Sequence, residues 1–475
     1  MKQARDGRVK ACLVFPNIYL GIPLNINTPI HPPLGLAYLA AVLREDGNQV
    51  KVIDAAAENI GLNNLAGRVK QFNPHFIGIT TNIANSRKAI LTARYLRGAI
   101  PECIIVMGGP WASVEYEMLL EDNIADVVVI GEGERTIVEL AKHVNDKERW
   151  KQIQGLVFST GDNPVFKTEP RPFIEDLDSL PFPAWDLFPS SRKYHFIHRR
   201  APFYPIMTTR GCPYDCIHCT KLVHGYKYRK RSMKNVLSEI RYLVDNFGTR
   251  EVFIIDDSFN LDMARAEKIL DEIIRQDFNL MIKFTNGIRA DRITPRLGKK
   301  LKAAGTYAAS LGIESGCQEI VHAIGKGLNL RAVIKAVKIL HENGMIVGGF
   351  FILGHPMDDF NSMMKTIDFA IALDLDYPQF FKSLPFPGTK MYDLIRKHGT
   401  FLDDGRALDG YSINTVNFSI WELHPEDIQR AFRFSYKAFY LRPVKILKLL
   451  LQYRSLTEFW WFIKSTIGVF LGNLF

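Results

Sequence analysis

Three cysteines lie close together at a spacing that suits a metal cluster. Cys212, Cys216 and Cys219 form a C-x3-C-x2-C motif in one short loop. A [4Fe–4S] cluster is ordinarily held by four cysteine thiolates. Three close cysteines with no obvious fourth would leave one iron open to another ligand. The spacing therefore predicts an iron–sulfur cluster that performs chemistry as well as storing electrons.

A structural zinc site is the alternative for this loop. His218 and His224 could each supply a fourth ligand, so the loop alone leaves zinc open. Zinc sites, however, usually combine C-x2-C with a second pair of ligands elsewhere. The other cysteines, Cys12, Cys103 and Cys317, lie in apolar or turn-like settings, and we expect them to be buried small side chains.

Polar residues and glycines follow the strand-like segments in the second half of the chain. These segments are Tyr204–Thr209, Glu251–Ile255, Leu280–Phe284, Ala308–Ile313, Gly348–Leu353 and Pro378–Ser383. Helical patterns between them, such as Arg331–Asn343, make βα units and predict a partial TIM-like barrel, whose chemistry belongs at the strand ends. The candidate binding residues there are Asp256, Asp257, Ser258, Gly312, Glu314, Ser315, Phe351 and Gly354. The adjacent aspartates could alternatively bind magnesium or cap a helix.

The first half alternates short apolar strands with single helices. The predicted strands are Val9–Phe15, Gln49–Asp54, Phe76–Thr80, Ile104–Met107 and Val127–Ile130. This pattern predicts parallel pairing in a doubly wound sheet, with ligands bound beyond the carboxyl ends of the strands. The loops at those ends are Pro16–Ile30, Thr80–Ser86, Gly108–Ser113 and Gly131–Glu134. No G-x-G-x-x-G follows the first strand, which argues against a dinucleotide.

Composition sets further limits on the 475-residue chain. Six cysteines, half of them in one loop, argue against a disulfide framework and for a reducing compartment. The N-terminus lacks the apolar core of a secretory signal. The net charge of +10 comes from short, scattered basic runs, which favours a solvated basic surface over a nucleic-acid footprint. Residues 443–475 are apolar and aromatic with interspersed charges, which fits either an interfacial helix or a helical cap.

Together these motifs resemble the radical S-adenosylmethionine (SAM) superfamily, in the group that carries an N-terminal cobalamin-binding domain. That group includes cobalamin-dependent methyltransferases and the anaerobic magnesium-protoporphyrin monomethyl ester cyclase. The resemblance implies an α/β fold: a doubly wound, Rossmann-like cobalamin domain (1–148), a proline-rich linker (149–200), a partial (β/α)6 radical SAM core (201–400) and a helical extension (401–475).

The resemblance also implies roles for particular residues. The three cysteines would ligate the cluster, and His218 stands where the family usually has an aromatic residue. Asp256 or Asp257 would take the place of a Gly-Gly-Glu turn that binds the SAM amino group. The segment from Gly312 to Ser315 would contact the SAM ribose or amino-acid moiety, and Gly349–Gly354, which includes Phe351, would cradle adenine.

In the first half, the resemblance assigns the loop residues to cobalamin. These residues are Thr80, Asn82, Gly108, Gly109, Gly131, Glu132 and Gly133. Gly131–Glu134 would line the nucleotide tail of the corrin, and His31 could face the ligand. The Asp-x-His-x-x-Gly motif, whose histidine binds the lower cobalt face in cobalamin mutases, is absent.

The implied activity is methyl transfer to an unactivated carbon of a small-molecule or lipid-like substrate. A deoxyadenosyl radical would abstract hydrogen, and cobalamin would deliver the methyl group. The alternatives are a cobalamin-dependent cyclase or ring-rearranging enzyme, and a non-catalytic iron–sulfur and cobalamin sensor. The expected partner is an electron donor such as flavodoxin or ferredoxin, and nucleic acid is not expected. We expect a cytoplasmic location, with peripheral contact to the membrane through the C-terminus.

Overall fold

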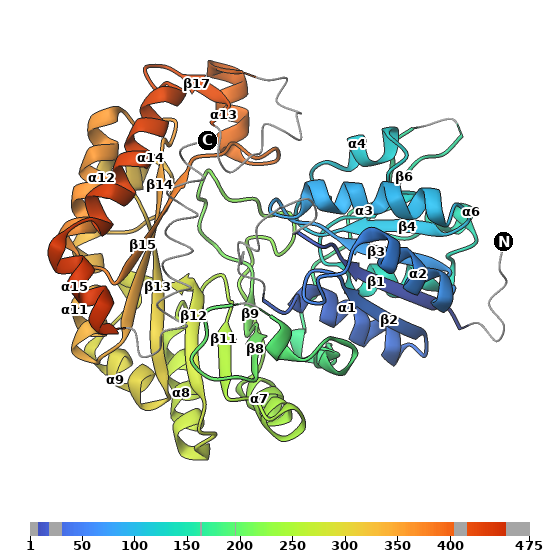
Figure 1. Ribbon diagram of the computed structural model, residues 1–475, viewed down its shortest axis with the longest axis horizontal. Coiled ribbons are helices and arrows are strands. Elements are labelled where there is room, and N and C mark those ends of the chain that lie inside the picture. The colour runs from blue at the N-terminus through green and yellow to red at the C-terminus, as the bar shows by residue number, and fades with distance from the viewer. Residues whose placement is uncertain (1–7, 19–30, 162–163, 195, 403–415, 453–475) are drawn as a thin grey trace.

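The first sheet consists of strands that are apolar on both faces. The computed structural model describes residues 8–18, 31–161, 164–194, 196–402 and 416–452. In β1 (Lys10–Phe15), Ala11 and Leu13 pack in one core cluster, whereas Cys12 and Val14 pack in another on the opposite face. A strand buried on both faces requires helices on both faces. The sheet is therefore doubly wound (Figure 1).

The strand order of this sheet is β2-β1-β3-β4-β5-β6-β7. The further strands are β2 (Gln49–Asp54), β3 (Phe76–Thr80), β4 (Ile104–Gly108), β5 (Val127–Val129), β6 (Leu156–Phe158) and β7 (Phe166–Lys167). The helices are α1 (Leu34–Glu45), α2 (Leu62–Phe72), α3 (Ser86–Ala99), α4 (Tyr116–Glu121), α5 (Gly133–Lys142) and α6 (Lys147–Trp150). Strands β1 to β5 are parallel and agree with the predicted ones, but β6 and β7 add antiparallel strands within the predicted linker.

The rest of the proline-rich connection packs across both domains, as its composition predicts. It contains three short 3-10 turns, at Leu177–Ser179, Trp185–Leu187 and Ser191–Lys193. Trp185 is buried, and its ring lies 5.3 Å from that of Tyr204 in the second sheet. The neighbouring Ala184 donates its amide to the carbonyl of Ala37 in α1. This segment therefore joins the two cores.

The second sheet is the predicted partial barrel, with the strand order β15-β14-β13-β12-β11-β8 and parallel pairing throughout. Its strands are β8 (Phe203–Ile206), β11 (Glu251–Ile254), β12 (Met281–Ile288), β13 (Thr306–Glu314), β14 (Ile346–Leu353) and β15 (Tyr377–Lys382). The covering helices are α7 (Met233–Phe247), α8 (Met263–Gln276), α9 (Pro295–Ala303), α10 (Gln318–Ala323), α11 (Leu330–Glu342), α12 (Phe360–Ala372) and α13 (Lys390–His398), with a 3-10 turn at Ala290–Arg292.

The C-terminal extension starts with a small hairpin and two helices. These elements are β16 (Gly399–Phe401), β17 (Phe418–Ile420), α14 (Pro425–Tyr440) and α15 (Pro443–Gln452). Helix α14 packs on β15 and α12, as a helical cap would. The remaining residues of the apolar segment, 453–475, lie outside the described part of the chain. Among the described residues, no helix is both long enough and apolar enough to cross a bilayer.

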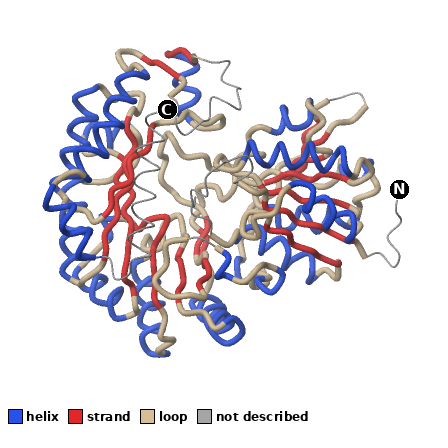
Figure 2. The backbone as a smooth tube through the Cα atoms, in the orientation of Figure 1, coloured by secondary structure: helices blue, strands red, loops and turns tan. Residues whose placement is uncertain are grey.

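The two sheets lie side by side with loops between them (Figures 1 and 2). Contacts between loops fix the orientation of the two sheets. The loop after β5 touches the cysteine loop: a Cβ added to Gly131 would lie 3.5 Å from the carbonyl oxygen of Leu222. The loop after β15 approaches the loop after β4, at Gly388 and Val114. The carboxyl ends of both sheets therefore face a common region.

Candidate active site

The cysteine loop leaves the barrel through a two-stranded neck. Strands β9 (Thr209–Arg210) and β10 (Arg229–Lys230) pair in antiparallel fashion at its two ends. Gly211 follows β9 with a φ of 84°, and a Cβ there would lie 2.2 Å from the carbonyl oxygen of Lys227. Only glycine accepts both conditions. The neck therefore holds the loop in one tight arrangement.

The cysteines themselves rest on a turn that follows α10. The amide of Ile217 donates to Ile324 O at 3.0 Å, and Cys216 Sγ lies 4.0 Å from Gly325 O. A hydrogen bond from Cys219, together with the charge of Lys326, outweighs burial and lowers the pKa of Cys216, whereas the same bond and burial raise the pKa of Cys219. Of the two thiols, Cys216 is therefore the one that favours the thiolate, the form that binds iron. Within the described residues, no three His, Cys, Asp or Glu side chains meet as a ready site for a single metal ion.

An ion pair lies beside this loop, at the end of β13. Lys326 Nζ is 2.7 Å from Glu314 Oε1, and both side chains are largely buried. Burial opposes ionisation of both groups, but each charge favours the other, so the pKa of Glu314 is lowered and that of Lys326 is raised. Gly312 makes room for the pair, because a Cβ there would lie 2.9 Å from Lys326 Nζ. The site therefore holds one buried anion and one buried cation next to the cysteines.

Arg289 fixes the turn that carries Lys326. Its guanidinium donates to the carbonyl of Lys326 at 3.3 Å and to that of Gly327 at 2.9 Å. The same group lies 3.6 Å from the ring centre of Tyr214 in the cysteine loop. One arginine thus links the end of β12, the Lys326 turn and the cysteine loop, so these three parts of the site are held in register.

Two histidines with unpaired nitrogens lie in the same place. The rings of His218 and His355 are 5.4 Å apart, and His355, which follows β14, is fully buried. Among the described residues, neither ring nitrogen of His355 has a hydrogen-bond partner, and neither does Nδ1 of His218. Burial is the main cause that lowers the pKa of His355 to about 3, and repulsion from His218 is the second. The His355 ring is therefore neutral. An unpaired buried polar group costs about 1–3 kcal/mol, which indicates a place for a ligand.

The residues after β11 divide into different roles. Asp256 is buried and accepts hydrogen bonds from both the amide and the hydroxyl of Thr208. Burial raises its pKa in spite of these bonds. Asp257 is exposed, and the buried hydroxyl of Ser258 has no hydrogen-bond partner within the described part of the chain. Asp256 therefore joins two strand ends, whereas Asp257 and Ser258 keep polar groups available.

Three other predicted residues are held by the protein itself. Ser315 Oγ lies 3.0 Å from Thr366 Oγ1 in α12. The Phe351 side chain is fully buried and stacks on Phe380, so only its backbone can serve a ligand cradle. Gly354 has a φ of 89° and packs against Ile428 of α14.

Comparisons with known proteins identify the family. Residues 28–141 match the B12 binding domain, and residues 206–370 match the radical SAM superfamily. An uncharacterized methyltransferase of Pyrococcus horikoshii is 32% identical over 94% of this chain and 96% of its own length. The chain belongs to the B12-binding radical SAM family.

Two further relatives support this membership. The cytidylyl-2-hydroxyethylphosphonate methyltransferase of Streptomyces wedmorensis is 27% identical over 79% of this chain and 80% of that protein. The solved structure of the cobalamin-dependent SAM radical enzyme OxsB, with aqua-cobalamin and SAM bound, covers 96% of this chain and 72% of its own, at 16% identity and a TM-score of 0.73. At that identity the likeness shows the shared fold.

The cofactors of this radical SAM enzyme are a [4Fe–4S] cluster, SAM and cobalamin. The residues near the cysteine loop fit SAM, because a buried ion pair and unpaired imidazole nitrogens suit a ligand with a charged amino acid at one end and a neutral base at the other. Within the described residues the loop does not form a ready site for a single metal ion, and His224 lies 3.3 Å from Glu132. That the three cysteines hold the cluster stays a prediction.

The predicted cobalamin residues lie along the carboxyl edge of the first sheet. Thr80, Asn82, Gly108 and Gly109 come from the ends of β3 and β4, at the edge where this fold binds ligands. Asn82 is exposed, and its backbone and side chain are bonded to Asn85, which shapes the loop. Gly109 lets the two loops meet, because a Cβ there would lie 2.3 Å from Thr81 O. Their contact with cobalamin stays a prediction.

The Gly131–Glu134 loop serves a second purpose that the sequence did not reveal. Gly131 and Gly133 lie after β5 as predicted, with Gly133 packed against Leu39. Glu132, in contrast, points at the cysteine loop and is bonded to Arg210, Arg229 and His224. Its predicted contact with the corrin tail stays untested, whereas its contact with the barrel is part of the structure.

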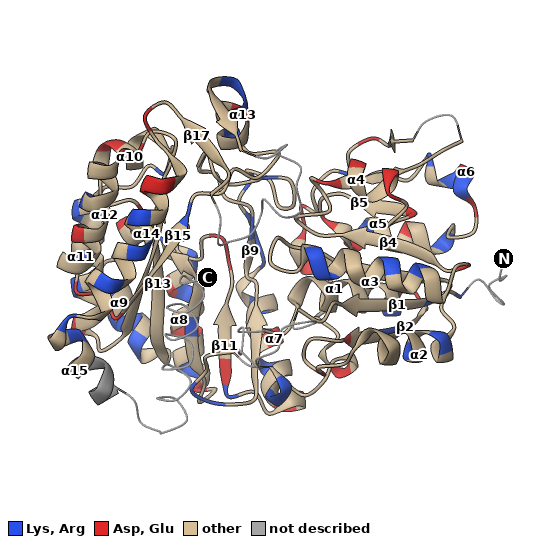
Figure 3. Ribbon diagram, turned by 45° about the horizontal axis from the view of Figure 1, so that its top comes forward, with Lys and Arg blue, Asp and Glu red and all other residues tan. Residues whose placement is uncertain are grey.

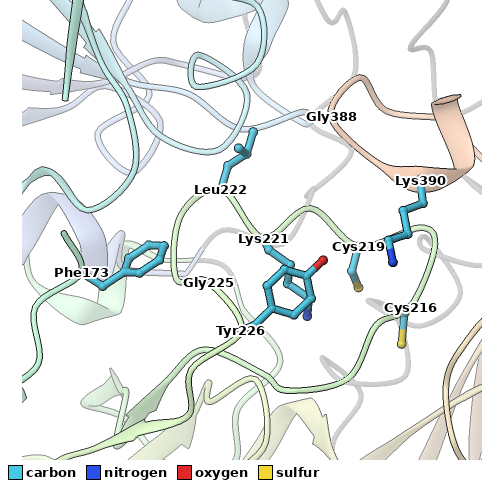
Figure 4. A pocket seen from close by; sticks show the side chains of 9 residues that line it. All are labelled: Phe173, Cys216, Cys219, Lys221, Leu222, Gly225, Tyr226, Gly388 and Lys390. Atoms are coloured by element: carbon cyan, nitrogen blue, oxygen red, sulfur yellow. The ribbon is translucent and has the colours of Figure 1, made fainter. Parts of the chain in front are cut away.

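A cavity of about 350 Å³ opens beside the cysteines. Figure 4 shows its lining residues, which come from the linker, the cysteine loop, the loop before α13 and the first residue of α13. Its lining residues are Phe173, Cys216, Cys219, Lys221, Leu222, Gly225, Tyr226, Gly388 and Lys390. The cavity is lined by two of the three cysteines that are predicted to ligate the cluster.

Sequence reasoning missed several residues of this site. Lys326 stands between two glycines with positive φ, of 72° and 59°, in a Gly-Lys-Gly turn that could have drawn attention. His355 was visible only as part of Gly354-His355-Pro356 after a strand. Arg210 and Arg229 lacked a sequence signal, because their partners lie far away in the first domain.

Proposed function

We propose that this enzyme transfers a methyl group from SAM to an unactivated carbon of a small-molecule or lipid-like substrate. One observation carries this proposal: the carboxyl edges of the two sheets face each other, and each edge bears the loops of one cofactor-binding domain. Facing edges supply the proximity that transfer between two cofactor sites requires. The P. horikoshii and S. wedmorensis relatives are both named as methyltransferases, which supports the same reaction class.

The residues of the site would divide the work of holding SAM. Lys326 would face the carboxylate of the amino-acid end, and Glu314 its ammonium group, because the pair is buried, charged and adjacent to Cys216. His218 and His355 would bind a neutral, polar part of a ligand through their unpaired nitrogens. When bound, SAM and the cluster supply the radical, and cobalamin supplies the methyl carrier. The protein orients these groups and excludes water.

Labelled SAM tests the reaction class. The reduced, cofactor-loaded enzyme is incubated with SAM that carries a deuterated methyl group and with fractionated small-molecule and lipid extracts. We expect a product whose mass rises by the labelled methyl group. Formation of 5′-deoxyadenosine without label in any product would instead point to cyclisation or rearrangement. Absence of both would favour the sensor.

We further propose that the cavity beside the cysteines (Figure 4) receives an acidic electron donor such as flavodoxin or ferredoxin. Lys221 and Lys390 line this cavity beside Cys216 and Cys219, and Lys390 is ion-paired with Asp215 of the cysteine loop, so within the described residues Lys221 supplies the uncompensated positive charge. Positive charge at the point where electrons enter favours an acidic partner and speeds their encounter. In the K221E variant, reduction by flavodoxin should slow while reduction by dithionite stays unchanged. Equal slowing of both would contradict this docking site.

Peripheral membrane contact is the remaining proposal. Helix α15 is held through Lys445, whose Nζ donates to Leu375 O, while Val444, Ile446 and Leu447 are exposed. An exposed apolar helix face next to an apolar, basic sequence is typical of interfacial helices. Such contact would bring the enzyme to a lipid-like substrate.

A further inference from the structure

The neck of the cysteine loop carries an unfavourable pair of charges. In the β9–β10 ribbon, Arg210 and Arg229 are directly opposite each other. Like charges at opposed positions of an antiparallel pair destabilise it. Both side chains are also buried, with 5% and 1% of the side chain exposed, so water does not screen the repulsion. The neck therefore needs negative charge from elsewhere in the chain.

The N-terminal domain supplies this charge. Glu132 Oε1 lies 3.1 Å from Arg210, and its Oε2 lies 2.9 Å from Arg229. Glu134, at the first turn of α5, lies 2.5 Å from Arg210. Figure 3 shows the basic stretch at β9 where the barrel meets the first domain. Two carboxylates of one loop thus balance two arginines of the other domain.

The carboxylate of Glu132 interacts with four donor groups. Besides the two arginines it accepts the amide of Ile174 at 2.7 Å, and His224 Nδ1 lies 3.3 Å away. Burial alone would raise the pKa of Glu132, but the bonds from His224 and Arg229, the charge of Arg210 and the Ile174 amide lower it to about 2. The group therefore stays ionised over the whole physiological range.

Arg229 extends the same arrangement into the loop. It donates to the carbonyl of Ile174 in the linker at 2.7 Å and to that of His224 within the cysteine loop at 2.8 Å. The linker, the cysteine loop and the first domain therefore converge on the Glu132–Arg229 pair.

We propose that Glu132 and Glu134 are positioning residues for the iron–sulfur cluster: the N-terminal domain holds the neck of the cysteine loop through Arg210 and Arg229. They act through the arginines and do not touch the cluster. The loop predicted to line cobalamin thereby also supports the cluster of the other domain. This inference is independent of the substrate and of methyl transfer.

The test compares E132Q with wild type in the full chain after anaerobic reconstitution. Glutamine keeps the shape of Glu132 and removes its charge, which leaves buried arginine charge without compensation. We expect a loss of bound iron and sulfide, an altered EPR spectrum of the reduced cluster, and a midpoint potential shifted to more positive values, because nearby positive charge favours the added electron. E132D, which keeps the charge, should regain part of the wild-type signal.

E139Q is the matched control. Glu139 lies on α5, the helix that starts directly after Glu132, and within the described part of the chain its ion-pair partner is Arg171 of the linker rather than an arginine of the neck. This variant should keep the iron content, EPR spectrum and midpoint potential of wild type. Wild-type cluster properties in E132Q would overturn the proposal. So would a loss of cobalamin binding and thermal stability in E132Q as large as its loss of iron, because that result would indicate a general folding role.

Discussion

At the scale of single residues, Lys326 offers the sharpest test of the SAM site. K326M keeps the length of the side chain and removes its charge. We expect SAM affinity to fall by about 10-fold or more, since a hydrogen bond to a charged group contributes ~1.5–3 kcal/mol. Equilibrium dialysis with radiolabelled SAM measures the effect. K335M, at an exposed position of α11, should bind SAM as wild type does. Equal affinities for K326M and wild type would contradict the assignment.

Replacing His355 should affect the stability of the ligand-free protein and its affinity for SAM in different directions. H355F keeps an aromatic ring against His218 and removes both unpaired nitrogens. Without ligand, thermal unfolding should occur at an equal or higher temperature, because an unsatisfied buried group has gone. With SAM, affinity should be lower than in wild type. A destabilised apo-protein with normal SAM affinity would show that His355 serves the core instead.

The cysteine motif was visible in the sequence because it depends on local spacing, and its role as the set of cluster ligands stays a prediction. The ion pair, the histidine pair and the glutamate–arginine contacts were not visible, because each joins residues distant in the chain. Ser315 and Phe351 show what the sequence could not reveal: Thr366 and Phe380 contact their side chains, so the predicted ligand contacts, which stay predictions, would fall to the backbone at Phe351. A strand end defines the location of a residue, and packing then decides where its side chain points.

At the scale of elements, two glycines of the first domain should respond in opposite ways to alanine. In G109A the new Cβ would meet Thr81 O at 2.3 Å, and φ is 103°. We expect a loss of stability of more than ~1 kcal/mol and weaker cobalamin binding. G98A, on the exposed side of α3 with open space around it, should gain about 0.5–1 kcal/mol. Chemical denaturation and cobalamin titration measure both; a tolerated G109A would contradict the tight approach of these loops.

Most strands and helices could be predicted from the sequence, because the periodicity of apolar residues follows which side chains are buried. The five strands of the first domain and the six of the barrel appear where apolar runs predicted them. Strands β6 and β7 were missed because they are very short and lie among prolines and loop residues. The predicted domain limits at 148 and 200 stay a prediction, although the first sheet itself extends to Lys167.

At the scale of the whole molecule, α15 tests where the enzyme works. V444E/L447E places charge on side chains that are 68% and 58% exposed. We expect this variant to lose flotation with anionic vesicles, because charge cannot enter the apolar interface. I334E alters an equally exposed apolar residue, 52% exposed, on α11 and should still float. Failure of wild type to bind vesicles, or equal loss in I334E, would contradict membrane contact.

For the arrangement of the two domains, the sequence predicted only that their cofactor-binding edges lie near each other. The sequence placed candidate residues at both carboxyl edges, whereas the contacts between Glu132, Arg210 and Arg229 show that these edges meet. Such contacts cannot be read from periodicity, because each arginine looks like an ordinary strand residue of a basic chain.

We propose that the cluster and cobalamin bind in one shared region between the two sheets. EPR spectroscopy can compare protein loaded with both the reduced cluster and cob(II)alamin with protein loaded with either one alone. Magnetic interaction between two nearby groups should broaden the lines and speed relaxation, so we expect a spectrum that differs from the sum of the single spectra. A spectrum equal to that sum would contradict this proposal by showing that the two groups lie far apart.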